Sequence, residues 1–302
     1  LHRTIVAVAG AALMLGAGLA LGFYSEAQAV AAIDFETVGL LLGMMILVAM
    51  LEPTGFFQYL AVWAGRLSKG NPLRLMILLG SITTLLSMFL DNVTTVVLIA
   101  PVTILISEVL GVNAAPLLMA EALLSDTGGV ATLVGDPPNV LIASAANFSF
   151  IDFLTHSLPV AAVAWLLTLL LLVRLFRMEL SLPPSNAEAM ASLDPAQALN
   201  DPKTARRVLV VLGGALVLFF LENTLGITPA YIALSAAAVA LVWVRPAVSD
   251  VLRRVEWGVL IFFAAILVAQ VLWGLGYTFT SGATEAWIAD EIGEAQAGRA
   301  FL

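Results

Sequence analysis

Residues 123–142 constrain the fold of this chain most strongly, because they interrupt an apolar segment with backbone that cannot stay helical. The interruption contains the pair Gly128 and Gly129, then Gly135, then the pair Pro137 and Pro138. An unpaired backbone N–H or C=O group is costly in hydrocarbon, so such a break must face protein or a water-filled cavity. Secondary transporters bind solutes and ions at breaks of this kind. The sequence therefore predicts a broken helix over residues 115–148, with a binding site at the break.

The composition is that of a membrane protein. Of the 302 residues, 61% are hydrophobic and 11% are charged, and the mean hydropathy is +1.02. These values predict an all-α polytopic membrane protein, with the lipid bilayer as a partner and the cell (inner) membrane as its multi-pass location.

The composition also disfavours several kinds of site. The chain has no cysteine, which excludes thiolate chemistry, and its only histidines are His2 and His156, which disfavours a histidine-rich metal site. A net charge of -8 offers no basic surface to nucleic acid. We therefore expect no cofactor, no resident metal and no nucleic-acid partner, apart from a coupling proton or Na⁺.

The positions of Lys and Arg predict the topology. Basic residues cluster at 66–74, 174–177, 203–207 and 245–254, and the positive-inside rule makes these segments cytoplasmic. The number of crossings between Arg74 and Arg174 must then be even. Either all four apolar blocks cross, or residues 75–110 form a re-entrant hairpin with Asp91 and Asn92 at a buried tip. We favour the hairpin, because these polar side chains are costly in a turn that faces lipid.

An internal repeat organises the remaining segments. The segment Ile33-Asp34-Phe35 and the apolar run after it are paralleled by Val255-Glu256-Trp257, 222 residues later. The charge-derived topology makes the two copies inverted, which is typical of transporters. By the same offset, the counterparts of Asp91 and Asp136 fall beyond Leu302, so we expect a truncated chain with an incomplete second repeat. The predicted first repeat is 1–177 (spans 4–23, 37–51 and 157–173, interfacial helix 55–68, hairpin 75–110, broken helix 115–148), followed by a cytoplasmic linker at 178–205 and the second repeat at 206–302.

Two polar segments are candidates for the site. The hairpin tip offers carboxylate, amide and hydroxyl groups at a helix N-terminus. The alternative is that Asp91 or Asn92 only caps that helix. The break offers freed carbonyls and polar side chains, against the alternative of a structural kink. The predicted substrate or ion site comprises Asp91, Asn92, Thr94, Thr95, Asp126, Thr127, Gly128, Gly129, Thr132, Gly135, Asp136, Pro137, Pro138 and Asn139, with Glu121 as a candidate proton carrier.

An enzyme is the alternative from another class. Asp91 and Asp136 resemble the aspartate pair of an intramembrane protease, but Leu133 occupies the first position of the Gly-x-Gly-Asp pattern of that family. The Gly-x-Ser-x-Gly and His-Glu-x-x-His motifs are absent from the sequence. We therefore expect no enzyme and keep an intramembrane hydrolase as a remote alternative.

The motifs also resemble a known family. The segments 90–95, 101–103, 128–139 and 255–257 resemble the arsenite permease and pink-eyed-dilution P protein family of the ion transporter superfamily, which is distantly similar to sodium-coupled dicarboxylate transporters. The resemblance runs through essentially the whole chain. It implies a scaffold domain and a transport domain, in which hairpin tips meet broken helices at the substrate site.

The resemblance implies a secondary transporter of a small ion, oxyanion or oxyacid of the arsenite and antimonite type. Transport would proceed by alternating access, coupled to H⁺ or Na⁺. The sequence does not fix the oligomeric state, and a homodimer is one assembly open to the protein. Asp91 stands where dicarboxylate carriers have Ser-Asn-Thr, which disfavours a dicarboxylate. A Na⁺/H⁺-type cation antiporter and a dicarboxylate or anion symporter remain the alternatives.

Overall fold

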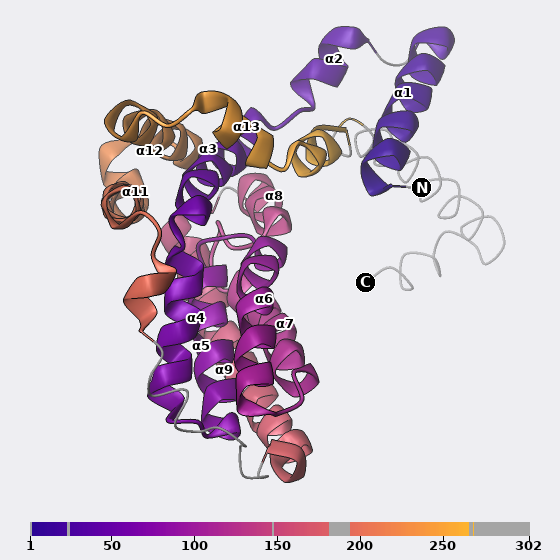
Figure 1. Cartoon of the computed structure of the whole chain (residues 1–302). Helices are drawn as coiled ribbons and strands as arrows, with labels where there is room; N and C mark the ends of the chain where they lie inside the picture. The colour runs from indigo at the N-terminus through magenta and orange to yellow at the C-terminus, as the bar shows by residue number, and fades with distance from the viewer. Residues whose placement is uncertain (1, 23–24, 147, 181–193, 266–267, 269–302) are drawn as a thin grey trace, which may run out of the picture. The chain divides into compact units, whose positions relative to one another are not determined.

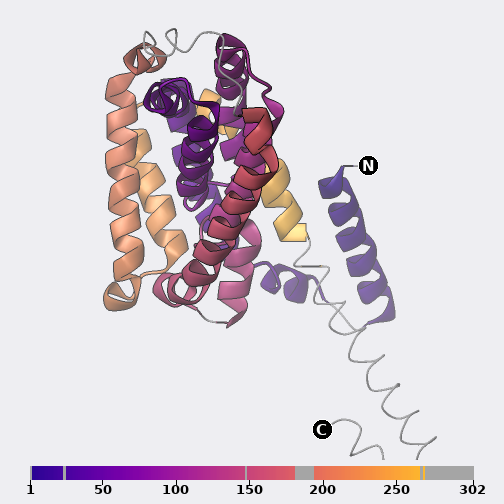
Figure 2. The ribbon, with the colours of Figure 1, turned by 90° about the horizontal axis from the view of Figure 1, so that it is seen from below.

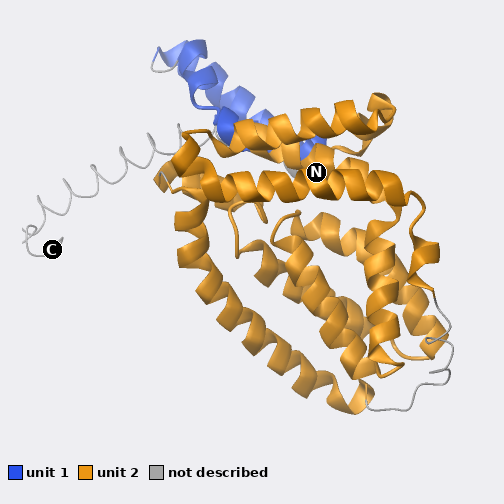
Figure 3. Ribbon diagram, turned by 90° about the vertical axis from the view of Figure 1, so that its left-hand side faces the viewer, with its two compact units in different colours: residues 1–38, 256–302 blue, residues 39–255 orange. Residues whose placement is uncertain are grey.

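The structure, a computed structural model, describes residues 2–22, 25–146, 148–180, 194–265 and 268 (Figure 1). Every regular element among these residues is a helix, and five of the helices are long and apolar enough to cross a bilayer. The predicted all-α polytopic class is thereby confirmed. The chain forms two compact units, residues 1–38 with 256–302 and residues 39–255 (Figure 3).

The first unit contains α1 (Arg3–Leu21), α2 (Glu26–Ala31) and a helical segment at 257–265. The ring nitrogen Nδ1 of His2 accepts a hydrogen bond of 3.3 Å from the backbone N–H of Thr4 and so caps α1. The hydroxyl of Thr4 donates to the carbonyl of Gly258 at 2.9 Å. α1 thus covers the span expected at 4–23 up to Leu21. The part of the predicted second repeat that follows residue 265 lies outside the described residues, apart from residue 268.

Both copies of the internal repeat begin a helix. Asp34 caps α3 (Phe35–Leu51), because its carboxylate accepts hydrogen bonds from the N–H groups of Glu36 and Thr37 at 3.0 and 3.2 Å. Glu256 precedes the helix at 257–265, and its carbonyl accepts from the N–H of Val259 at 2.9 Å. The two motifs therefore share a local structure, while their inverted orientation stays a prediction.

In the second unit, α7 is the central helix. It packs against α5, α6 and α9, and α4 covers the hairpin formed by α5 and α6 (Figure 1). The elements of this part are η1 (Glu52–Thr54), α4 (Phe56–Ser68), α5 (Pro72–Ser87), α6 (Asn92–Leu110), α7 (Ala115–Gly129), α8 (Pro137–Ala146) and α9 (Phe150–Leu180).

α4 covers the residues of the interfacial helix expected at 55–68. Phe57, Ala61 and Ala64 are fully buried against the rest of the unit, while Trp63 and Leu67 are exposed. The helix therefore leaves two large apolar side chains on the surface of the unit. Its location at the membrane interface stays a prediction.

α9 begins earlier than the span expected at 157–173. Ser149 and Asp152 form a reciprocal cap, in which the N–H of Ser149 donates to Asp152 at 3.2 Å and the N–H of Asp152 donates to the hydroxyl of Ser149 at 3.1 Å. This capping box starts the helix at Phe150. The polar residues before 157 thus belong to the first turns of α9.

The described part of the expected linker at 178–205 carries structure of its own. Residues 181–193 lie outside the described residues, but η2 (Pro195–Ala198) packs against α4. The N–H groups of Asn200 and Asp201 donate to the carbonyl of Thr54 at 2.8 and 3.2 Å. Gly55 has a φ of +81°, and a side chain there would strike the carbonyl of Ala198. Glycine thus permits the close docking of this segment.

The remaining helices are α11 (Pro202–Leu225), α12 (Pro229–Val244) and α13 (Val248–Arg254). α11 and α12 lie side by side (Figures 1 and 2). Small residues bring α3 onto α12, since an added side chain at Gly43 would come within 2.5 Å of the carbonyl carbon of Ala233. Small residues are typical of close helix contacts in membranes.

The contact at Gly43 gives a stability test. Gly43→Ala should destabilise the protein by about 1–3 kcal/mol, because the added methyl group overpacks α3 against α12. The matched control is Gly213→Ala on α11, where no atom lies within 4 Å of an added side chain. There, alanine should match or raise the stability, since it favours a helix. Thermal unfolding of both purified variants in detergent measures the difference, and equal melting temperatures would refute the close contact.

Candidate functional site

The tip of the α5–α6 hairpin consists of residues 88–91, and Asp91 caps α6. The Asp91 carboxylate accepts hydrogen bonds from the N–H and the hydroxyl of Thr94 at 2.8 and 2.9 Å. The backbone carbonyl of Asp91 accepts from the hydroxyl of Thr95 at 2.8 Å. The capping role is thus present, and Thr94 and Thr95 take part in it.

The hairpin tip contacts α7 through Asn92. Its side-chain amide donates to the carboxylate of Asp126 at 2.9 Å. Thr127, the next residue on α7, donates its hydroxyl to the carbonyl of Leu124 within the same helix at 2.8 Å. The tip and the end of α7 are therefore brought together by Asn92 and Asp126 rather than by Thr127.

The predicted helix break is present at residues 130–136, between α7 and α8. Asn139 donates its amide to the carbonyls of Gly129 and Thr132, both at 2.9 Å. The hydroxyl of Thr132 donates to the carbonyl of Met88 and accepts from the N–H of Gly135 at 3.2 Å. Thr132 and Asn139 are buried, so these two side chains satisfy the freed backbone inside the protein.

Glycine is required where the break meets the hairpin. A side chain on Gly128 would strike the carbonyl of Thr84, and one on Gly135 would lie 2.6 Å from the carbonyl oxygen of Ser87. Gly129 is also buried beside Gly135. The two segments therefore approach each other backbone to backbone. Of the prolines that begin α8, Pro137 is buried and Pro138 is exposed.

We call the region where the hairpin tip (88–91) meets the break (130–136) the junction. Three hydroxyl groups at this junction were not predicted from the sequence. Thr84 and Ser87 on α5 donate to the carbonyls of residues 124 and 125 on α7 at 3.0 and 2.8 Å. Ser157 on α9 donates to the carbonyl of Val130 at 2.5 Å. The only signal in the sequence is the presence of hydroxyl side chains in otherwise apolar helices.

The electrostatics of the junction are acidic. Asp136 interacts electrostatically with Asp91 and Asp126. Asp126 is exposed, whereas Asp91 and Asp136 are partly buried. The sequence from Leu75 to Val173 contains no Lys or Arg. Among the described residues, no group of three acidic or histidine side chains converges closely enough to hold a metal ion. The three carboxylates therefore lie near one another within a stretch of the chain, residues 75–173, that contains no Lys or Arg.

Glu121 lies on α7 and is fully buried. One carboxylate oxygen accepts a hydrogen bond from the hydroxyl of Thr103 on α6. The other oxygen has no hydrogen-bond partner among the described residues. Glu121 is thus separate from the hydrogen bonds at the junction, although it lies on the same helix as Asp126.

Comparison with known proteins identifies the family. The profile of the CitMHS family, described as "Citrate transporter", matches residues 1–300. The chain belongs to this family. It is 41% identical over 270 residues to the "46 kDa membrane protein" of Mycobacterium leprae, covering 88% of this chain and 62% of that protein. An "Uncharacterized transporter" of Mycobacterium tuberculosis is 42% identical over 300 residues, covering 96% of this chain and 68% of that protein.

The CitMHS-family chain is also similar to P protein. The human P protein is 49% identical over 144 residues, which cover 47% of this chain and 17% of that protein. The similarity to P protein indicated by the motifs is therefore confirmed, and the family is one of multi-pass membrane transporters. The chain spans about two thirds of the length of its mycobacterial relatives or slightly less.

The hydrogen bonds of Asn139 give a test of the break. Asn139→Leu should destabilise the protein by about 1–3 kcal/mol, because it leaves two buried carbonyls without a donor. Ser144→Ala, at an exposed position on the same helix, is the matched control and should leave the stability unchanged. The measurement is the melting temperature in detergent. Equal melting temperatures for the two variants would mean that Asn139 does not hold the break.

Proposed function

We propose that the full-length protein is a secondary transporter of the cell (inner) membrane that carries a small ion or oxyacid by alternating access, coupled to H⁺ or Na⁺. The acidic junction is the observation that carries this proposal. Three carboxylates lie near one another at a helix break, and residues 75–173, which contain the break and the hairpin tip, include no Lys or Arg. Carboxylates inside a membrane protein are costly unless a proton or cation compensates them. Coupling to a proton or cation follows from this excess of negative charge.

In this proposal, the hairpin tip and the break form the substrate site together. Asp91 and Asp136 would carry the coupling proton or Na⁺, and Asn92 would hold Asp126 in position through the bond of 2.9 Å. Carbonyl groups at 130–136 and the N-terminus of α8 offer further ligands for a small polar solute. Thr132 and Asn139 would keep this backbone in place.

A neutral oxyacid such as arsenite, As(OH)₃, is the substrate class that the acidic junction favours. Its hydroxyl groups can donate hydrogen bonds to carboxylates, whereas an anion would be repelled. Citrate is the second candidate, favoured by the description of the matching family as a citrate transporter. As an anion, it would have to enter together with protons or cations that compensate the junction.

Flux measurements in inverted membrane vesicles distinguish the candidates. Vesicles that contain the full-length protein receive an imposed proton gradient, and arsenite, citrate and Na⁺ fluxes are compared. Arsenite flux supports a transporter of neutral oxyacids, and citrate flux supports a citrate transporter. Na⁺-dependent proton movement supports an antiporter. Flux of none of the three above empty vesicles would contradict the proposal, and hydrolytic activity without a gradient would favour an intramembrane hydrolase.

Asp136 should be essential for transport. Asp136→Asn should abolish flux while the protein still inserts into the membrane, because the change removes a titratable carboxylate and preserves its shape. Glu108→Gln is the control, since it also removes a titratable carboxylate, at an exposed position on α6. Flux and membrane abundance are measured for both variants. Normal flux in Asp136→Asn would mean that the break is not part of the substrate site.

Glu121 should act as a proton carrier. Glu121→Gln retains an oxygen that accepts from Thr103 but cannot release a proton, so it should remove the dependence of flux on the proton gradient. Glu108→Gln, at an exposed position on α6, is the control. The readout is flux at several imposed gradients. A variant with unchanged gradient dependence would assign Glu121 a structural role only.

A further inference from the structure

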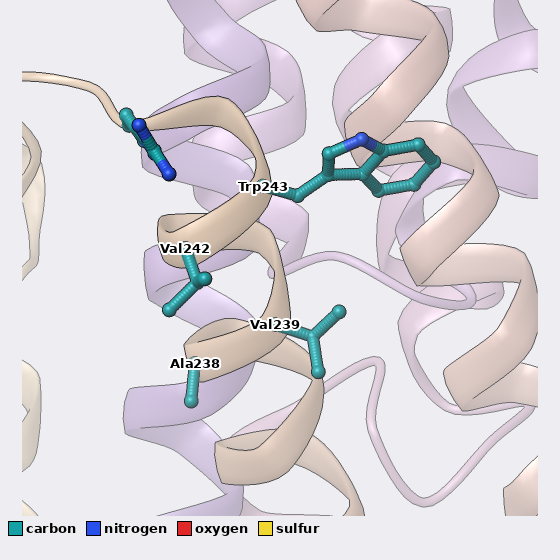
Figure 4. A pocket seen from close by; sticks show the side chains of 5 residues that line it. Ala238, Val239, Val242 and Trp243 are labelled. Carbon is teal, nitrogen blue, oxygen red and sulfur yellow. The ribbon is translucent and has the colours of Figure 1, made fainter.

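An exposed apolar groove runs along α12 and ends at an arginine. Its volume is about 580 Å³, and it is lined by Ala238, Val239, Val242 and Trp243, with Arg245 at the end of the helix (Figure 4). Figure 4 shows that Ala238 and Val242 lie one turn apart on one side of α12. Val242 is 72% exposed and Trp243 is 47% exposed. The groove is therefore an open apolar surface of the second unit.

A polar pocket adjoins this groove and shares Arg245 with it. The pocket has a volume of about 430 Å³ and lies between η1, the start of α11 and α13. Its polar lining consists of Thr54, Asp201, Thr204, Arg245, Asp250 and Arg254. Arg254 also forms an ion pair of 2.6 Å with Glu52 on η1. One arginine thus joins an apolar groove to a polar pocket.

The surroundings of the two cavities carry an excess of positive charge. Residues 201–207 and 245–254 contain six basic side chains and two acidic ones, and Glu52 adds a third acidic group. Arg207 lies with its guanidinium carbon 6.0 Å from the centre of the Trp243 ring and donates to the Trp243 carbonyl at 3.4 Å. The guanidinium of Arg245 forms no hydrogen bond or ion pair with any residue that the structure describes. Arg245 is therefore available to an anion.

The acidic groups of the pocket limit the kind of ligand that the pocket can bind. Hydrogen bonds from the backbone N–H and the hydroxyl of Thr204 lower the pKa of Asp201, so this carboxylate is ionised at neutral pH. Ionised Asp201 and exposed Asp250 accept hydrogen bonds but repel phosphate. A ligand fits both the free arginine and the two carboxylates when its phosphate binds Arg245 and its hydroxyl groups donate hydrogen bonds to the carboxylates.

We propose that the groove and the pocket together bind one anionic phospholipid. An acyl chain lies along Ala238 and Val242, the phosphate binds Arg245, and headgroup hydroxyls reach the pocket. A lipid fits better than a soluble anion, because only an amphiphile uses the apolar and the polar cavity at once. The basic segments at 203–207 and 245–254 are those expected on the cytoplasmic side, where anionic lipids attract Lys and Arg. This site is independent of the proposed transport site.

Lipid retention tests this proposal. The full-length protein is reconstituted with equal amounts of phosphatidylglycerol and phosphatidylcholine, purified in mild detergent, and its retained lipids are counted by native mass spectrometry. The protein should retain phosphatidylglycerol in preference to phosphatidylcholine. Arg245→Gln should lower that retention about fivefold, the factor that corresponds to about 1 kcal/mol for one basic residue near anionic lipid. Arg177→Gln, an exposed arginine at the end of α9, is the control and should retain the lipid normally.

A second variant tests the apolar half of the site. Ala238→Trp fills the groove from an exposed position, so it should expel phosphatidylglycerol without unfolding the protein. Equal retention of both lipids, or normal phosphatidylglycerol retention in both Arg245→Gln and Ala238→Trp, would overturn the proposal. A change from dimer to monomer in Ala238→Trp with normal lipid retention would also overturn it, since the groove would then hold a second copy of the chain. Displacement of the bound lipid by inorganic phosphate alone would reduce the site to an anion site.

Discussion

The helix break between α7 and α8 leaves backbone N–H and C=O groups that must find hydrogen-bond partners within the protein. The arrangement of the hairpin and its neighbours depends on which side chains supply these partners. A buried carbonyl or N–H without a partner costs about 1–3 kcal/mol. Asn139 alone provides donors for two carbonyls, and Ser157 provides one for Val130. Thr132 connects the break to the hairpin tip through Met88. The break is thus a packed structure with defined partners.

The same partners hold the carboxylates near one another. The hairpin approaches the break backbone to backbone at Gly128 and Gly135, and Asn92 fixes Asp126 against the tip. The polar contacts needed to stabilise a non-helical segment therefore also concentrate negative charge there. Because residues 75–173 contain no Lys or Arg, the cost of this charge is the physical basis for expecting a bound proton or cation.

The sequence predicted the features that depend on local chemistry. Glycine and proline pairs favour the ends of helices, so the break at 130–136 followed from the sequence, and the capping of α6 by Asp91 followed from the position of Asp91 before an apolar helix. Partners distant in the chain were not predictable, because Ser87 and Ser157 carry no local mark of the carbonyls that they contact. The limits of α9 differed from the expectation, since the capping box at Ser149 outweighs the polarity of the first turns. The buried face of α4 was not part of the prediction, because small residues there permit a contact that hydrophobic spacing alone does not indicate.

In the proposed mechanism, the transported solute binds at the junction of the hairpin tip and the break, and cysteine protection tests this proposal most directly. The chain has no cysteine of its own, so Thr127→Cys at the junction and Ser144→Cys on the exposed side of α8 each introduce one thiol into this part of the protein. The rate of labelling by a membrane-impermeant maleimide is measured with and without the solute identified by flux. The account predicts slower labelling at position 127 and an unchanged rate at position 144 when solute is present. Unchanged rates at both positions, with flux intact, would contradict it.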